Sequence, residues 1–261
     1  MRLLGKDCVT VCLVLAAGTG CTGGGAGPEH TAPPPTPTPT RSTVPETPGA
    51  EPPHFVSIPG LVAREHRGSG LRLGTVRLRT DAYTQYAVTY EANGLTISGL
   101  MNVPAGKGPF PALVLAHGYI DPDVYTTGRG LAREQDLLAR NGYVVLHTDH
   151  RNHVGSDDDP DNDVDLRLGY TEDVIAAARA AFVGPPEIDG DRIGLLGRSM
   201  GGVVVYDTLV VAPGLVDAAV VYAPVSSRPD ENLDHFQRRD GDPVVARIEA
   251  EHGSPRENPV F

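Results

Sequence analysis

Two hydrophobic patterns follow one another along the chain. Apolar and polar residues alternate with a period of two over residues 75–79 and 86–90, and Asn93-Gly94 leads into a similar segment, 95–98. This is typical of half-exposed strands joined by a hairpin turn. Later apolar residues form continuous runs, as in strands that helices cover on both faces: 112–116, 144–146, 193–196 and 218–222. The chain is therefore predicted to have an α/β fold, with antiparallel first strands, a mostly parallel central sheet and helices on both faces.

Helical periodicity separates the later runs. Residues 174–182 carry one apolar helical stripe, for which Thr171 is the expected N-cap and Gly184-Pro185 the expected end. A second helix is expected from about residue 130 to Asn141-Gly142, and a third over residues 203–209. Strands and helices thus alternate from residue 112 onward, as a parallel sheet requires.

The first sixty residues differ from the rest. Residues 1–21 have a basic start and an apolar stretch over 9–17, too short to span a bilayer, and predict a secretory signal. The run ending at Cys21 resembles the cleavage site of bacterial lipoproteins, although Gly18 stands where those sites usually carry Leu. That resemblance implies a lipid on Cys21 and a membrane anchor; plain secretion and an inert cysteine are the alternatives. In each of the first two cases the protein is exported.

Composition divides the chain in the same place. Residues 22–60 are rich in Thr, Pro and Gly and predict an extended, disordered tether without a core. Residues 61–261 then form the globular domain, whose stability must come from core burial, because all three cysteines lie in the leader. The net charge of −11 argues against a nucleic-acid partner, and the sequence carries no signal for an oligomeric state.

A G-x-S-x-G motif lies between the strand at 193–196 and the helix at 203–209. A strand, a sharp turn and a helix are the context that a nucleophile elbow requires, which makes Ser199 the candidate nucleophile. Gly197 and Gly201 remove side chains that would clash in the turn, and the helix N-terminus favours developing negative charge. The alternative is a tight glycine-rich turn without chemistry.

A second motif, His117-Gly118-Tyr119, follows the strand at 112–116. With both motifs the chain resembles the α/β-hydrolase superfamily over about residues 70–261. The resemblance implies the backbone N–H groups of Tyr119 and Met200 as the oxyanion donors, with His117 in a structural role. No metal or organic cofactor is implied.

Residues 144–156 look like the D-x-R-G-x-G-x-S signature of prolyl-oligopeptidase-like and dienelactone-hydrolase-like enzymes. Asp149, Arg151, Gly155 and Ser156 match, whereas Asn152 and His153 depart from it. Together with residues 197–202 and 222–225, this loop favours a prolyl-oligopeptidase-like serine peptidase with a peptide substrate. A carboxylesterase or lactonase acting on an ester is the alternative, and a non-catalytic scaffold of the same fold is a third.

The superfamily order is Ser, then Asp, then His. After Ser199 the chain offers His235 and His252, in a polar segment over about 226–255 that resembles the family's cap, with Val244, Val245 and Ile248 as its apolar face. We expect the chain to lack the last two strands and, with them, the catalytic Asp and His. The alternative is that His235 or His252 substitutes as the base.

Two segments resemble metal sites, and neither pattern is complete. Asp161, Asp163, Asp165 and Glu172 have calcium-loop spacing, but Leu166 stands where the turn demands Gly. Residues 147, 150 and 153 are histidines, but a strand that passes into a loop is not expected to aim all three at one zinc ion.

Overall fold

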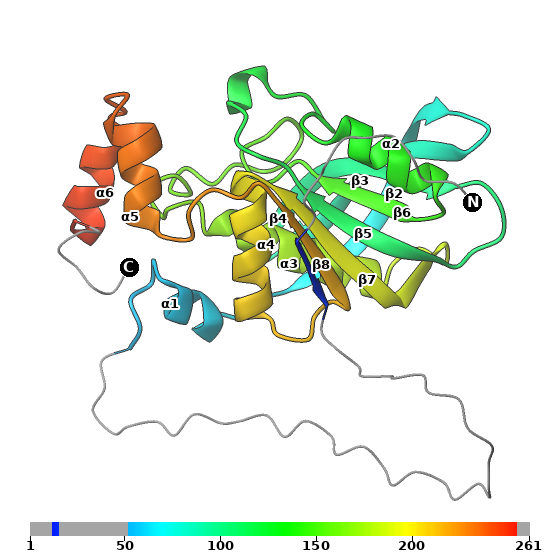
Figure 1. Cartoon of the computed structure of the whole chain (residues 1–261), viewed down its shortest axis with the longest axis horizontal. Helices are drawn as coiled ribbons and strands as arrows, with labels where there is room; N and C mark the ends of the chain where they lie inside the picture. Colours follow the sequence, from blue (N-terminus) through cyan, green and yellow to red (C-terminus); the bar gives the residue numbers. More distant parts are fainter. Residues whose placement is uncertain (1–11, 16–51, 255–261) are drawn as a thin grey trace, which may run out of the picture.

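The computed structural model describes residues 12–15 and 52–254. Within them one sheet runs in the order β1-β8-β7-β5-β6-β4-β3-β2 (Figure 1). The strands are β1 (Cys12–Leu15), β2 (Gly68–Arg79), β3 (Tyr83–Ala92), β4 (Leu95–Pro104), β5 (Phe110–Ala116), β6 (Val144–Thr148), β7 (Ile188–Arg198) and β8 (Ala218–Tyr222). β1 comes from the predicted leader and pairs antiparallel with β8. Cys21 and the predicted tether up to residue 51 lie outside the described residues.

The first three strands after the tether form the predicted antiparallel meander. β2 pairs with β3 and β3 with β4, both antiparallel. The turn between β3 and β4 has positive φ at Asn93 (49°) and Gly94 (95°), as the favoured hairpin turn demands. The prediction from Asn93-Gly94 is therefore confirmed.

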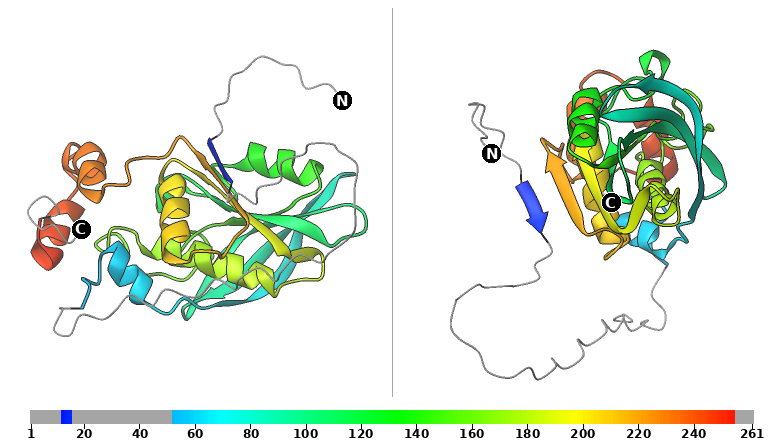
Figure 2. Two further views of the ribbon diagram at one scale, coloured as in Figure 1. Left: turned by 60° about the horizontal axis from the view of Figure 1, so that its bottom comes forward. Right: turned by 90° about the vertical axis from the view of Figure 1, so that its right-hand side faces the viewer.

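The second half of the sheet is parallel, because β6, β5, β7 and β8 are neighbours that run in one direction. β5 shows why its sequence is continuously apolar. Ala112, Val114 and Ala116 lie in the main core, whereas Leu113 and Leu115 pack in a separate cluster on the other side. Helices cover both faces of the sheet (Figures 1 and 2), as predicted.

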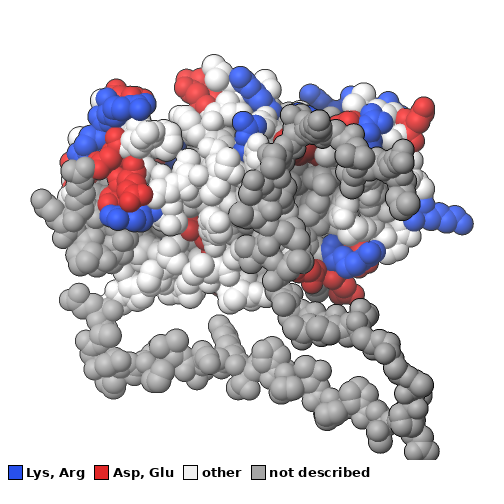
Figure 3. All heavy atoms as spheres, viewed as in Figure 1, with Lys and Arg blue, Asp and Glu red and all other residues white. Residues whose placement is uncertain are grey.

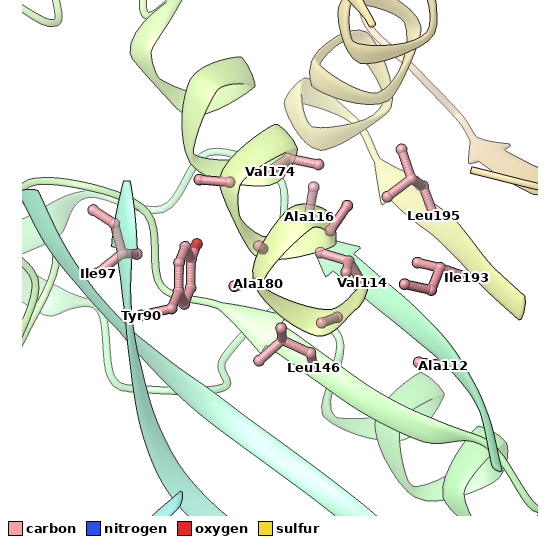
Figure 4. Packing of buried hydrophobic residues seen from close by; sticks show 14 of the residues in the cluster. Tyr90, Ile97, Ala112, Val114, Ala116, Leu146, Val174, Ala180, Ile193 and Leu195 are labelled. Atoms are coloured by element: carbon pink, nitrogen blue, oxygen red, sulfur yellow. The ribbon is translucent and has the colours of Figure 1, made fainter. Parts of the chain in front are cut away.

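The main core lies between the sheet and helix α3 (Gly169–Phe182). Figure 4 shows α3 laid across the strands, with Val174 and Ala180 facing β5 and β7. Its many alanines allow the helix to approach the sheet closely. The expected N-cap is wrong: the helix begins two residues before Thr171, whose backbone already lies in the first turn and whose hydroxyl points to Asp207.

The other helices of the domain are α2 (Ala132–Arg140) and α4 (Met200–Val211), which starts directly at the G-x-S-x-G motif. α2 ends at Asn141 and Gly142, as predicted, with Gly142 at φ 85°. None of the described helices is long and apolar enough to cross a membrane.

The packed part of the chain begins before residue 61, its expected start. Helix α1 (Ile58–Ala63) is capped by Ser57, whose hydroxyl accepts from the Gly60 N–H. Val56 and Leu61 are fully buried in a small core. Val56 lies before residue 61 and is nevertheless buried, so the boundary predicted from composition is too late in the chain.

The predicted cap segment is helical and stands apart from the sheet (Figure 1). It contains α5 (Pro229–Asn232), the π-helix η2 (Leu233–Arg238) and α6 (Val244–His252). Leu233 and Ile248 pack on Val164 of the loop before α3. A short 3₁₀-helix, η1 (Pro122–Val124), lies in the loop after β5.

Candidate active site

Ser199 occupies the sharp turn between β7 and α4. Its torsion angles are φ 57° and ψ −122°, a region that L-residues rarely adopt and that costs about 1–3 kcal/mol. The surroundings hold it there: its N–H donates to the Tyr222 carbonyl at 3.1 Å, and its own carbonyl accepts from Gly202 at 2.9 Å. A strained, firmly held serine at a strand end is the geometry that the motif predicted.

The glycines around Ser199 are required by close backbone approach. A Cβ on Gly201 would collide with the carbonyl of Ala116 and lie 2.6 Å from that of His117. A Cβ on Gly197 would collide with the Gly201 carbonyl. The turn therefore fits tightly against the end of β5.

The second motif lies directly beside Ser199. A Cβ on Gly118 would be 3.1 Å from the Ser199 Cβ, so the backbone after β5 passes next to the serine. In the described part of the chain, neither the Tyr119 N–H nor the Met200 N–H donates to another protein group. Two unengaged amides that flank the serine are what an oxyanion site needs, and their role stays a prediction.

Ser199 opens into a cavity of about 870 Å³, a volume suited to a small organic ligand. Its walls come from α4, from residues 56–59, from the loop before α3 and from the cap. Apolar side chains make up a large part of these walls: Val56, Ile58, Pro59, Leu166, Leu168, Met200, Val203, Val204, Val225, Leu233 and Phe236. Within residues 52–254, no histidine lines this cavity.

The two arginines that line the cavity are each paired with an aspartate. The Arg167 guanidinium lies 4.4 Å above the ring of Tyr119 and donates to Asp163 at 2.6 Å. Arg228 of the cap donates to Asp230 at 2.7 Å. Two further aspartates, Asp207 and Asp242, line the cavity. Asp207 contacts Thr171 of α3, and burial raises the pKa of its carboxyl to about 7.

The signature loop after β6 joins several elements. Asp149 accepts hydrogen bonds from Ser98 and Tyr125, both at 2.7 Å. Arg151 is buried and forms ion pairs with Asp159, Glu172 and Asp173, at 2.8–3.1 Å. Ser156 accepts from the Ser98 N–H at 2.9 Å. These matched residues therefore hold β4, β6 and α3 together and lie away from Ser199.

Four histidines pack around one another under the loop: His117, His147, His150 and His153. The His117 ring centroid lies 5.5 Å from that of His147, 4.8 Å from His150 and 5.4 Å from His153. Burial lowers the pKa of His117, and lowers those of His147 and His150 well below the usual value. Their convergence was not predicted, but no group of His, Cys, Asp or Glu in the described residues is arranged to hold a metal ion.

The other sequence candidates lie elsewhere. His252 contacts Asp165 at 3.1 Å, and His235 packs on Phe236; neither lines the cavity with Ser199. In the loop with calcium-like spacing, Asp163 pairs with Arg167 instead. Leu166 has a positive φ of 55° at the position where such loops use Gly.

This architecture matches a known family. Residues 113–259, more than half of the chain, match the model of the alpha/beta hydrolase family. The chain belongs to the alpha/beta hydrolase family. The sequence resemblance is thereby confirmed at this level, and so is the α/β fold.

Individual relatives of this alpha/beta hydrolase are distant. The chain is 29% identical to human acyl-coenzyme A thioesterase 1 over 132 residues, 50% of this chain and 28% of that protein. It is 27% identical to the uncharacterized peptidase YtmA of Bacillus subtilis (strain 168) over 176 residues, 67% of this chain and 62% of YtmA. It is 28% identical to esterase EstD of Thermotoga maritima over 151 residues, which are 56% of this chain and 35% of EstD. The chain thus spans less than two thirds of each.

Among solved structures, acetyl xylan esterase 1 from Thermoanaerobacterium sp. JW/SL YS485 superposes with a TM-score of 0.52. It is 21% identical, and the match covers 74% of this chain and 65% of that one. At this identity the likeness establishes a shared fold.

Sequence reasoning missed Asp207 as a cavity residue. The signal was present: residues 200, 203 and 204 are apolar and share one face of α4, and position 207 continues that face with an acid. An acid in an otherwise apolar helical stripe is unusual enough to mark a site.

Proposed function

We propose that this alpha/beta hydrolase cleaves carboxylic esters by acyl transfer through Ser199. The observation that carries the proposal is the strained Ser199, which lines the cavity and is flanked by the unengaged amides of Tyr119 and Met200. Strain of this kind persists where the surrounding structure enforces it, and it gathers at functional sites.

In the proposed reaction the Ser199 hydroxyl attacks the carbonyl carbon of the substrate. The Tyr119 and Met200 N–H groups donate to the oxyanion, together with the positive end of the α4 dipole. The alcohol then leaves with a proton, and water hydrolyses the acyl-enzyme to free Ser199 and the acid. The base that takes the serine proton is not among the described residues that line the cavity.

An ester is favoured over a peptide by the cavity. Its walls carry many apolar side chains, and its two arginines are already paired with aspartates, so neither arginine is free to bind the carbonyl groups of a peptide. A peptide substrate is the second candidate, which the similarity to YtmA and the signature loop support. The prolyl-oligopeptidase-like assignment belongs to this candidate.

We also propose that the leader exports the protein and that Cys21 carries a lipid. The basic start, the apolar stretch and the small residues before Cys21 support this. Metabolic labelling with an alkyne fatty acid is expected to mark the wild-type protein and not Cys21→Ala. Equal labelling of both would contradict the anchor.

The activity test compares matched substrates. The protein expressed from its complete gene is assayed with an aryl ester and the corresponding anilide, alongside Ser199→Ala and the control Ser69→Ala, which changes an exposed serine on β2. We expect ester turnover to exceed anilide turnover and to fall by at least about 10³-fold in Ser199→Ala alone. Preferential anilide cleavage would favour the peptidase, and unchanged turnover in Ser199→Ala would refute the proposal.

A further inference from the structure

One face of α4 forms a wall of the cavity from Ser199 downward. Met200, Val203, Val204 and Asp207 all line it, and their spacing of three, four and seven residues places them in one row on the helix. The row is apolar until it reaches Asp207. On the outer surface, Figure 3 shows charged side chains gathered over the cap and few over α4.

The Asp207 carboxylate has little to satisfy it. In the described part of the chain its one hydrogen-bond partner is the Thr171 hydroxyl, at 3.5 Å, and no basic side chain is near enough to influence it. Burial accordingly raises its pKa to about 7. Arg167 and Arg228, the two arginines of the cavity, are engaged with Asp163 and Asp230.

The charge of the cavity as a whole points to a cation. Four aspartates line it against two arginines: Asp163, Asp207, Asp230 and Asp242, with Arg167 and Arg228. Asp242 accepts from the Val244 N–H at the start of α6. Asp207, at the end of the apolar row, is therefore the lining acid that has neither an ion pair nor a short hydrogen bond. A ligand cation would supply the charged hydrogen bond that the protein does not.

The distance between Ser199 and Asp207 sets the length of the ligand. Asp207 lies eight residues after Ser199, which corresponds to about 12 Å along a helix. An extended alkyl chain of about ten bonds covers this distance. The ligand needs a few bonds fewer, because the side chains of Ser199 and Asp207 themselves reach toward it. The walls between them, including Ile58 and Leu168, are apolar.

We infer that the cavity binds an acyl chain with an ammonium group at its far end, held by Asp207, while its carbonyl lies at Ser199. This rests on the proposed function and specifies its substrate class as esters of ω-amino acids with about eight carbons in the acyl chain. A simple alkyl chain of equal length would cover the Asp207 carboxylate without donating a hydrogen bond to it, so it is bound less well.

Binding can be tested without turnover. Two primary amides are titrated into the full protein by calorimetry: 8-aminooctanamide, and nonanamide, in which a methyl group replaces the ammonium. The wild type is expected to bind 8-aminooctanamide more tightly. In Asp207→Asn, which keeps the shape and removes the charge, the ratio of the two Kd values is expected to shift about tenfold or more toward nonanamide. The control Asp191→Asn changes an exposed acid on β7 and leaves the ratio unchanged.

Each result decides the matter. An unchanged ratio in Asp207→Asn overturns the inference, and so does a wild type that binds neither amide. 4-Aminobutanamide, which is too short to reach from Ser199 to Asp207, serves as a length control: if it shows the same dependence on Asp207, the geometry is wrong. If the preference is present but Ser199 proves unreactive, the ammonium site holds and the proposed hydrolysis fails.

Discussion

Replacing one buried histidine is predicted to change how stability depends on pH. His147 lies in β6 with no exposed surface, and neither ring nitrogen has a hydrogen-bond partner among the described residues. Its folded pKa is well below the ordinary value of 6.5 because burial disfavours the imidazolium. His147→Leu fills a similar volume and removes the titrating group.

The sign and size follow from linkage. Below pH 6.5 the unfolded chain binds a proton at His147 and the folded protein does not, so stability is lost as the pH falls. Between pH 7.5 and 5.5 one such histidine lowers the free energy of unfolding by about 1.4 kcal/mol. The raised pKa values of Asp165, Asp173 and Asp207 act in the opposite direction, but they are common to both proteins and cancel in the comparison.

Urea unfolding, followed by circular dichroism at pH 8.5, 7.5 and 5.5, measures the effect. From pH 7.5 to 5.5 His147→Leu should lose about 1.4 kcal/mol less than the wild type, while both change equally from 8.5 to 7.5. At pH 7.5 the variant should be at least as stable, because an unsatisfied buried polar group is removed. If both proteins lost the same free energy of unfolding between pH 7.5 and 5.5, this account of the histidine cluster would be refuted.

Three further substitutions test the site and its support. Ser199→Gly should raise the free energy of unfolding by about 1 kcal/mol, because Gly accepts φ 57° without strain; a destabilised variant in urea unfolding would contradict the strain. Gly201→Ala should destabilise the protein by about 1–3 kcal/mol or more, because its methyl group would overlap the Ala116 carbonyl, and an unchanged melting temperature would argue against the tight turn. Asp173→Asn should cost about 1–3 kcal/mol by removing one charged hydrogen-bond partner of Arg151, which keeps Asp159 and Glu172, and an unchanged free energy of unfolding in urea would show that the loop network matters little.

Local sequence signals predicted the elements whose causes are local. Asn93-Gly94 specifies a turn through its own backbone preferences, and the continuous apolar runs mark strands buried on both faces. The G-x-S-x-G motif positioned Ser199 correctly because strand, turn and helix are contiguous in the chain.

Features that depend on distant contacts were missed. Thr171 has the chemistry of an N-cap, but packing of α3 on the sheet extended the helix past it. Val56 was assigned to the tether because its burial depends on Ile175 and Val211, more than a hundred residues away. Asp207 and the histidine cluster likewise become visible only when separate elements meet.

The most direct test of the central claim is to locate the reactive nucleophile. The protein from its complete gene is treated with a fluorophosphonate, digested and mapped by mass spectrometry. The account predicts a single major adduct on Ser199, absent in Ser199→Ala and retained in Ser69→Ala. An adduct on another residue, or none on a protein that is shown to be folded, would contradict the assignment of Ser199 as the nucleophile.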